Sequence, residues 1–273
     1  MARYPLVAGN WKMNMTVPQA RELVGYLLDQ KDDVSPVEIA VCPPFTALWP
    51  IGRQLKEGGS ALRLGAQDMF GDSGGAFTGM ISAPMLRDCG CTYVIVGHSE
   101  RRGRFGKLPD WLTPALHGLF ADNDETVAAK ARVVLKSGLV PIICCGETID
   151  ERKGGKTDQV VGSQMKAALS ALPEDKLDQI VVAYEPVWAI GTGEVCGAPE
   201  AQRVCALVRE TIRGFSASAA DKVRVLYGGS LNADNAQEIF EGSDVDGGLV
   251  GGASLQGPEF AAIVRAAKAT YKG

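Results

Sequence analysis

Short apolar segments alternate with amphipathic stretches along the whole chain. Several of the apolar segments are continuous runs rather than alternations of apolar and polar residues. Continuous runs are typical of parallel strands that are covered on both faces. We therefore expect eight strands, at residues 6–9, 37–42, 63–66, 93–96, 140–144, 180–183, 223–227 and 248–250.

The stretches between these strands carry the sequence signals of helices. Pro18, Pro199 and Pro258 stand where a first helical turn would begin, and Gly214 stands where a helix would end. Eight strands that alternate with helices over about 250 residues predict an α/β fold, a closed eight-stranded parallel (β/α)8 barrel. On the pattern alone, a doubly wound open sheet remains the alternative.

One region interrupts the alternation of strands and helices. Residues 103–119 contain Pro109, Trp111 and Pro114 and are too long for an ordinary strand-to-helix loop. No shift in composition and no low-complexity segment marks a linker elsewhere. We therefore expect a single barrel domain over residues 1–273 with a local insertion at about 103–119.

The net charge of the chain excludes one class of binding partner. The chain has 273 residues, with 28 Lys and Arg against 32 Asp and Glu and a formal net charge of −4, and the two signs are mixed along it. A nucleic-acid binder would need a clustered positive surface, so this partner class is excluded. No run of about 18 apolar residues could form a transmembrane helix, so we expect no membrane association.

Cysteine usage indicates the compartment. The cysteines number seven, include no CxxC pair and lie mostly in apolar stretches. This pattern favours free thiols in a reducing compartment over a disulfide framework or a zinc site. The first residues also lack the long apolar core of a secretory signal. We expect a cytoplasmic protein.

Two candidate acid–base residues stand at the ends of expected strands. His98 comes shortly after the strand at 93–96, and Glu185 comes shortly after the strand at 180–183. In a parallel barrel the carboxyl ends of the strands form the rim where chemistry takes place. Glu185 precedes an apolar segment, 186–193, that ends in Gly-Thr-Gly and looks like a mobile lid. Desolvation under a closed lid would make the carboxylate a stronger base.

Other strand ends suit an anionic substrate. Asn10 and Lys12 flank Trp11 after the first strand, and their spacing of two predicts that both side chains share one face. Glycine-rich turns at 227–230 and 249–254 would let backbone N–H groups approach a phosphate group, which binds after the last two strands in barrels of this kind.

These motifs, in this order, resemble the triosephosphate isomerase family over essentially the whole chain outside the 103–119 insertion. The two longest blocks are very specific to the family. The matching blocks are AGNWKMN (8–14), GAFTG (75–79), VGHSERR (96–102), CGE (145–147), AYEPVWAIGTG (183–193), YGGS (227–230) and LVGGASL (249–255).

The resemblance implies interconversion of dihydroxyacetone phosphate and D-glyceraldehyde 3-phosphate through an enediolate. In that reaction Glu185 is the base that moves a proton between two carbons, and His98 is a neutral electrophile. Lys12 and Asn10 stabilise the developing oxyanion, and Glu100 supports that end of the site. Backbone N–H groups hold the phosphate, and the implied substrate-binding residues are Asn10, Lys12, Gly191, Ser230, Leu249, Gly251 and Gly252.

The resemblance also implies that neither a metal nor an organic cofactor takes part, which agrees with the lack of metal-ligand spacing in the sequence. Members of the family are usually homodimers. In them the loop around Gly74 and Thr78 reaches into the partner subunit near Lys12 and His98.

Two departures from the family pattern fall at the expected interface. Met80 replaces a glutamate that normally pairs with an arginine, at the position of Arg101, in the partner subunit. The 103–119 insertion starts two residues after Arg101. We expect the insertion to pack near the interface, with Asp110 or Asp122 as a partner for Arg101. The alternative is that it folds back over its own barrel.

Two other functions stay open on the sequence. An isomerase of a four-carbon ketose phosphate would use the same residues. A non-catalytic sugar-phosphate binding protein belongs to a different class and would have no need of a base. The presence of Glu185, His98 and Lys12 together favours an enzyme.

Overall fold

The computed structural model describes residues 3–30, 34–59, 62–105, 113 and 122–271. Most of the insertion predicted at 103–119, including Asp110, lies outside these residues. Its packing against an interface therefore stays a prediction.

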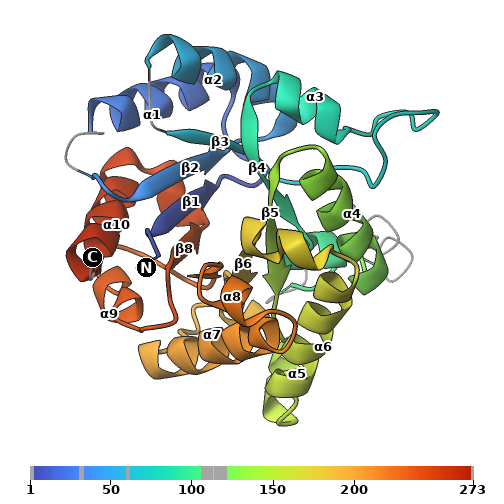
Figure 1. The fold of residues 1–273 in the computed structure, drawn as a ribbon. Helices are drawn as coiled ribbons and strands as arrows, with labels where there is room; N and C mark the ends of the chain where they lie inside the picture. Colours follow the sequence, from blue (N-terminus) through green and yellow to red (C-terminus); the bar gives the residue numbers. More distant parts are fainter. Residues whose placement is uncertain (1–2, 31–33, 60–61, 106–112, 114–121, 272–273) are drawn as a thin grey trace.

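Eight parallel strands close into a barrel in chain order (Figure 1). The first strand pairs with the last, Leu6 opposite Gly247 and Gly9 opposite Val250, which confirms the closed barrel and excludes the open sheet. Each strand begins and ends within two residues of its predicted range. The strands are β1 (Leu6–Asn10), β2 (Glu38–Cys42), β3 (Arg63–Ala66), β4 (Cys91–Val96), β5 (Val140–Cys145), β6 (Val181–Tyr184), β7 (Arg224–Tyr227) and β8 (Gly247–Val250).

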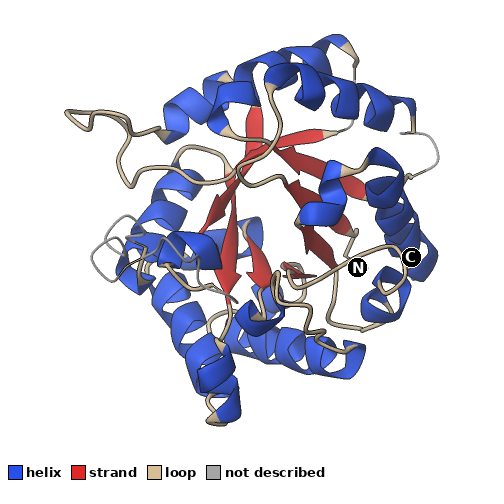
Figure 2. Cartoon of the chain, turned by 180° about the vertical axis from the view of Figure 1, so that it is seen from behind, coloured by secondary structure: helices blue, strands red, loops and turns tan. Residues whose placement is uncertain are grey.

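Helices follow the strands and form an outer ring around the barrel (Figure 2). Pro18, Pro199 and Pro258 lie in first turns, as predicted, and Gly214 follows the last residue of α7. The α-helices are α1 (Val17–Asp29), α2 (Phe45–Glu57), α3 (Ala83–Asp88), α4 (Asp124–Lys136), α5 (Ile149–Lys153), α6 (Thr157–Ser170), α7 (Ala198–Arg213), α8 (Ala217–Ala220), α9 (Ala236–Phe240) and α10 (Gly257–Thr270). The 3₁₀ helices are η2 (Ser99–Arg102), η4 (Glu174–Gln179), η5 (Val187–Ala189) and η6 (Gly252–Leu255).

The strands are buried on both faces, which explains their continuous apolar runs. Successive side chains of a strand point to opposite faces of the sheet. In β1, Leu6 and Ala8 pack inside the barrel, whereas Val7 packs in the layer between strands and helices. The barrel interior is filled by Leu6, Ala8, Ala40, Cys42, Tyr93, Ile95, Ile142, Cys144, Val181, Ala183, Leu226 and Leu249.

A polar network closes the barrel near the amino ends of its strands. Arg224 Nη2 donates to the Tyr93 hydroxyl at 2.7 Å, that hydroxyl donates to Glu38 Oε2 at 2.8 Å, and Arg224 also pairs with Glu38. Burial, with the Glu38 carboxylate beside it, raises the pKa of Tyr93 to about 12. The network satisfies polar groups that would otherwise be left unpaired at this end. The carboxyl ends carry the candidate site.

Candidate active site

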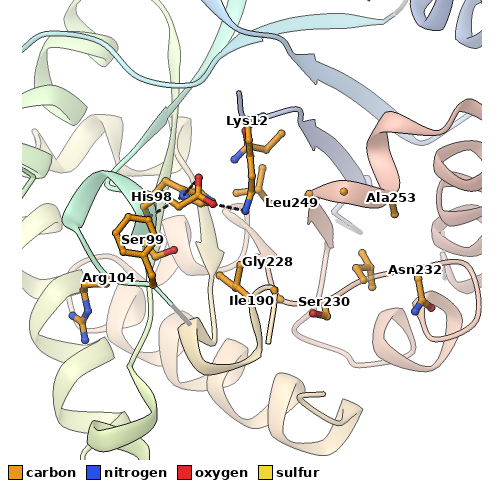
Figure 3. Close-up of a pocket in the computed structure, with 18 of the residues that line it drawn as sticks. Lys12, His98, Ser99, Arg104, Ile190, Gly228, Ser230, Asn232, Leu249 and Ala253 are labelled. Atoms are coloured by element: carbon orange, nitrogen blue, oxygen red, sulfur yellow. Dashed lines mark hydrogen bonds and ion pairs between the residues drawn. The ribbon is translucent and has the colours of Figure 1, made fainter. Parts of the chain in front are cut away.

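The carboxyl ends of the strands surround a pocket of about 510 Å³ (Figure 3). The structure brings together in its walls every predicted site residue except Glu185. Those that line it are Asn10, Lys12, His98, Glu100, Gly191, Ser230, Leu249, Gly251 and Gly252.

Glu185 lies directly behind the pocket wall and is only 1% exposed. The Ser99 backbone N–H donates to its Oε2 at 2.9 Å. Its Oε1 lies 3.0 Å from His98 Nε2. Gly228 lines the pocket, and a Cβ at that position would lie 3.0 Å from Glu185 Cγ. The missing side chain at Gly228 therefore leaves room for the Glu185 side chain beside the pocket.

The environment of Glu185 favours its ionised form. Burial alone raises the pKa of this carboxyl, but His98, the Ser99 N–H and the Lys12 ammonium together outweigh burial and hold the pKa below its usual value. Burial thus acts on the Glu185 carboxyl in the predicted direction, and the stronger basicity expected under a closed lid stays a prediction. Burial itself is confirmed; its electrostatic effect is overcome by the donors around the carboxylate.

His98 is held in one tautomer by the turn that follows β4. The Glu100 N–H donates to His98 Nδ1 at 3.2 Å, so Nδ1 carries no proton and the neutral ring carries its proton on Nε2. The ring is buried, with 6% of the residue exposed. A neutral imidazole with a directed Nε2–H can donate a hydrogen bond to a carbonyl oxygen in the pocket.

Lys12 reaches the pocket through an unusual backbone conformation. Its φ of 53° lies in the left-handed region, which costs a non-glycine residue about 1–3 kcal/mol. Asn10 Oδ1 accepts from the Lys12 N–H at 3.1 Å, and Gln67 Nε2 donates to the Lys12 carbonyl at 2.8 Å. Asn10 and Lys12 do line one pocket, as predicted, but β1 ends at Asn10 and strand alternation is not the reason.

The Lys12 ammonium links two parts of the pocket. Its Nζ lies 2.6 Å from Glu100 Oε1. Its Cε lies 3.6 Å from where a Cβ of Gly251 would be, so the stem passes beside the turn after β8. The positive charge therefore sits between His98 and the glycine-rich turns, where it can face a phosphorylated carbonyl compound.

The lid segment predicted at 186–193 has a firmly held first half. Trp188 Nε1 donates to Glu147 Oε1 at 2.8 Å, and the Tyr184 hydroxyl donates to the same oxygen at 3.2 Å. The Arg152 guanidinium lies 4.2 Å from the centre of the Trp188 ring. Burial raises the pKa of Glu147 against the opposing effect of these donors and of Arg152.

The second half of the segment is exposed. Gly191 and Gly193 have φ values of 67° and 84°, a region that glycine enters without strain. Both glycines are exposed. The Ser230 hydroxyl donates to the Ala189 carbonyl at 2.5 Å, where the two halves meet. The segment thus combines an anchored start with an exposed tip, in which the Thr192 hydroxyl donates back to the Trp188 carbonyl at 2.7 Å.

Arg101 has a partner within its own chain. Arg101 Nε lies 2.8 Å from Asp68 Oδ2. Lys130 Nζ bridges Asp68 and Asp122, at 2.7 Å from a carboxylate oxygen of each. Within this chain Lys130 takes the Asp122 carboxylate and Asp68 neutralises Arg101, so Arg101 does not pair with Asp122 of its own chain. The pairing of Arg101 with Asp110 or Asp122 across an interface stays a prediction.

Sequence reasoning missed three residues that shape the site. Gln67 anchors Lys12 and also donates to the Cys42 carbonyl at 2.9 Å. Ser99 supplies the N–H that holds Glu185, and Gly228 gives that side chain room. Gln67 comes directly after β3, so the strand-end signal that singled out His98 could have found it.

Two kinds of feature are absent from the part of the chain that the structure describes. No three His, Cys, Asp or Glu side chains there are grouped so that they could hold a metal ion. No helix there has the length and apolar character needed to cross a bilayer.

Comparison with known proteins agrees with this geometry. The family model described as triosephosphate isomerase matches residues 5–267. A triosephosphate isomerase from Endomicrobium trichonymphae is 45% identical over 266 residues, covering 97% of this chain and 100% of the relative. One from Roseiflexus sp. (strain RS-1) is 46% identical over 263 residues, covering 96% and 97%. The chain belongs to the triosephosphate isomerase family.

Proposed function

We propose that this chain interconverts dihydroxyacetone phosphate and D-glyceraldehyde 3-phosphate with Glu185 as the base. The observation that carries the proposal is the pairing of Glu185 with His98 behind the pocket. Oε2 is held by the Ser99 N–H, and Oε1 lies 3.0 Å from His98 Nε2. The ionised Oε1 is thus the atom that takes a proton from the substrate carbon and returns it to the neighbouring carbon. His98 moves a proton from the substrate hydroxyl to the former carbonyl oxygen, so that the carbonyl and the hydroxyl exchange places.

His98 and Lys12 would stabilise the enediolate. When Glu185 turns toward the substrate past Gly228, the His98 Nε2–H is released to donate to the carbonyl oxygen. Negative charge develops on this oxygen as the carbon loses its proton. Hydrogen-bond donors that are already fixed in place lower the activation barrier most. The Lys12 ammonium adds a positive charge there, and Asn10, whose Oδ1 accepts from the Lys12 N–H, has its amide N–H groups left to donate. Glu100 holds Lys12 in position.

The phosphate would lie against the glycine-rich turns. Gly252 has no atom within 4 Å of where its Cβ would be, so an anion can approach the backbone there. Its N–H belongs to the first residue of η6, and unpaired N–H groups at such positions favour anions. Together with the N–H groups of Gly191, Ser230 and Gly251, it would hold the substrate at the end remote from the reacting carbons. Leu249 lines the pocket between the two ends.

A coupled assay tests the proposed reaction. The chain is supplied with D-glyceraldehyde 3-phosphate and, separately, with a four-carbon aldose phosphate, and product formation is followed. We expect turnover of the triose phosphate at a kcat/KM at least tenfold above that of the four-carbon compound. A higher kcat/KM for the four-carbon compound would assign the site to that substrate, and binding without turnover of either would make the chain a binding protein.

We further propose that two copies form a homodimer. An apolar groove of about 830 Å³ lies beside the active site and shares Lys12, His98 and Glu100 with it. The apolar groove is lined by Phe45, Phe70, Phe77, Met80 and Ile81 among others, and Phe77 is 44% exposed. Such a surface next to a polar site is typical of a protein interface. The loop around Gly74 and Thr78, which projects from the barrel ahead of α3, would fill the apolar groove of the second copy (Figures 1 and 2).

We place the enzyme in the cytoplasm. All seven cysteines are free, and all except Cys89 are buried. Thiols that are left unpaired fit a reducing compartment. The expectation is tested by fractionating cells and assaying isomerase activity in the soluble cytoplasmic fraction.

A further inference from the structure

Arg104 lies at the rim of the active-site pocket, immediately beyond the turn that carries His98 and Ser99 (Figure 3). Gly103 ends η2 in the left-handed conformation, with a φ of 67°, and redirects the chain. The Arg104 N–H then donates to the Ser99 carbonyl at 2.9 Å. The backbone of Arg104 is therefore tied to the residue whose own N–H holds Glu185.

The side chain of Arg104 reaches across to α5. Its guanidinium pairs with the Glu151 carboxylate. Glu151 also accepts from the Thr148 N–H at 2.8 Å and from the Thr148 hydroxyl at 3.1 Å, which fixes the first turn of α5. The ion pair thus joins the His98 turn to the start of this helix.

The next residue of α5 holds the lid. Arg152 stacks on Trp188, lies 3.8 Å from Glu147 Oε1 and pairs with Glu200 at 2.8 Å. Trp188, in the first half of the lid segment, is anchored by its hydrogen bond to Glu147. A continuous set of contacts therefore runs from Ser99 through Arg104, Glu151 and Arg152 to the lid.

We propose that Arg104 is a positioning residue that holds the lid anchor in register with the His98–Ser99 turn. The Arg104–Glu151 pair fixes α5 against that turn, so the lid closes with its tip correctly placed over the groups that react. This inference rests on the proposed isomerase function of the same site. It adds a residue outside the blocks of the chain that match the family.

The pair should act on catalysis more than on folding. The two side chains are 22% and 30% exposed, and ion pairs with this exposure contribute little to stability. A small displacement of a positioning element, in contrast, reduces rates strongly, by about 10²-fold for 1 Å in sensitive sites. A loosened lid also admits water to the enediolate, which then eliminates phosphate to give methylglyoxal.

The test uses the full chain with Arg104→Gln, Glu151→Gln and the double variant. Glutamine at 151 can keep the contacts to Thr148 while it removes the charge that Arg104 needs. Arg104→Lys keeps the positive charge. The matched control is Arg213→Gln, which removes an arginine that pairs with Glu210 and Asp221 and is remote from the lid. The measurements are kcat/KM for D-glyceraldehyde 3-phosphate, the fraction of methylglyoxal among the products, and the melting temperature.

We expect each single variant to lose about tenfold in kcat/KM and to release more methylglyoxal. The double variant should lose no more than either single variant, because both remove one interaction. Lysine should restore part of the rate, and the melting temperature should match that of Arg213→Gln.

Three outcomes would overturn the inference. If Arg104→Gln kept the kcat/KM and the methylglyoxal fraction of the parent chain, Arg104 would have no positioning role. Losses that add in the double variant would mean that Arg104 acts on substrate directly and not through Glu151. If kcat/KM fell only together with the melting temperature, the Arg104–Glu151 pair would have a merely structural role. Failure of the proposed function is distinguishable, because the parent chain itself would then lack isomerase activity.

Discussion

At the residue scale, the properties of Glu185 come from its neighbours rather than from burial. A carboxylate with 1% exposure would ordinarily be driven toward its neutral form. Here the Ser99 N–H and His98 lie at 2.9 and 3.0 Å from its two oxygens, and Lys12 adds a positive charge nearby. The carboxyl group of Glu185 is therefore held in its ionised form in the ligand-free chain.

This arrangement predicts the pH dependence of Glu185. The folded-state pKa is below the usual 4.5, so the group stabilises the fold above that value, and the contribution is lost as pH falls through the folded pKa. Carbon-13 NMR of labelled glutamate, with Glu185→Gln to assign the signal, should show Glu185 titrating below pH 4.5 in the ligand-free chain. A midpoint above 4.5 would mean that burial dominates after all.

A side chain at Gly228 is predicted to fit only if Glu185 shifts. A Cβ there would lie 3.0 Å from Glu185 Cγ and 3.3 Å from the Tyr184 carbonyl. Gly228→Ala should therefore displace the base and lower kcat/KM by about 10²-fold. The matched control is Gly162→Ala in α6, where a Cβ meets nothing within 4 Å and activity should stay unchanged. Equal activity in the two variants would refute the role of Gly228.

At the scale of elements, strand positions were predictable because every strand is buried on both faces. Residues 6–9 and 140–144 read as continuous apolar runs, and a closed parallel barrel buries such runs completely. The residues at the carboxyl ends of the strands then indicated where the candidate site lies. The left-handed conformation of Lys12 could not be predicted, because it depends on Gln67, which is distant in sequence.

Partners of charged side chains were harder to predict than the elements. Asp68, which pairs with Arg101, is the second residue after β3, and no local pattern links it to Arg101. The pairing follows from the order of strands around the barrel, where β3 neighbours β4. Likewise, the sequence shows that Glu185 follows a strand but not that Ser99 and His98 will hold its carboxylate.

The lid gives a prediction at the same scale. Deletion of residues 189–192 removes the tip and the Ala189 carbonyl that accepts from Ser230. The enediolate would then be exposed to solvent, and a larger fraction of it should leave as methylglyoxal and free phosphate. Product analysis by NMR measures that fraction. The same product ratio in the deletion variant and the parent would remove the lid from the mechanism.

At the scale of the whole molecule, the apolar groove predicts assembly. Phe77 packs against Phe70 with ring centres 4.4 Å apart and presents the rest of its surface to solvent. Phe77→Asp would place a charge in the proposed interface, where desolvation is costly. Sedimentation at low micromolar protein should show a shift from dimer to monomer with a loss of activity.

The control for assembly is Tyr4→Asp. Tyr4 is an exposed aromatic residue, 59% exposed, that packs on Tyr271 and does not line the apolar groove. This variant should sediment like the parent. If Phe77→Asp also sediments like the parent and keeps its activity, the apolar groove is not the subunit interface.

Proton transfer by Glu185 is the central claim, and hydrogen exchange tests it most directly. Dihydroxyacetone phosphate is incubated in D₂O with the parent chain and with Glu185→Gln, and deuterium on carbon is followed by NMR while calorimetry measures substrate binding. The parent should exchange one carbon-bound hydrogen at a rate comparable to turnover. Glu185→Gln should bind the substrate nearly as well but exchange about 10³-fold more slowly. Exchange by Glu185→Gln at more than about a tenth of the parent rate would contradict the assignment of the base.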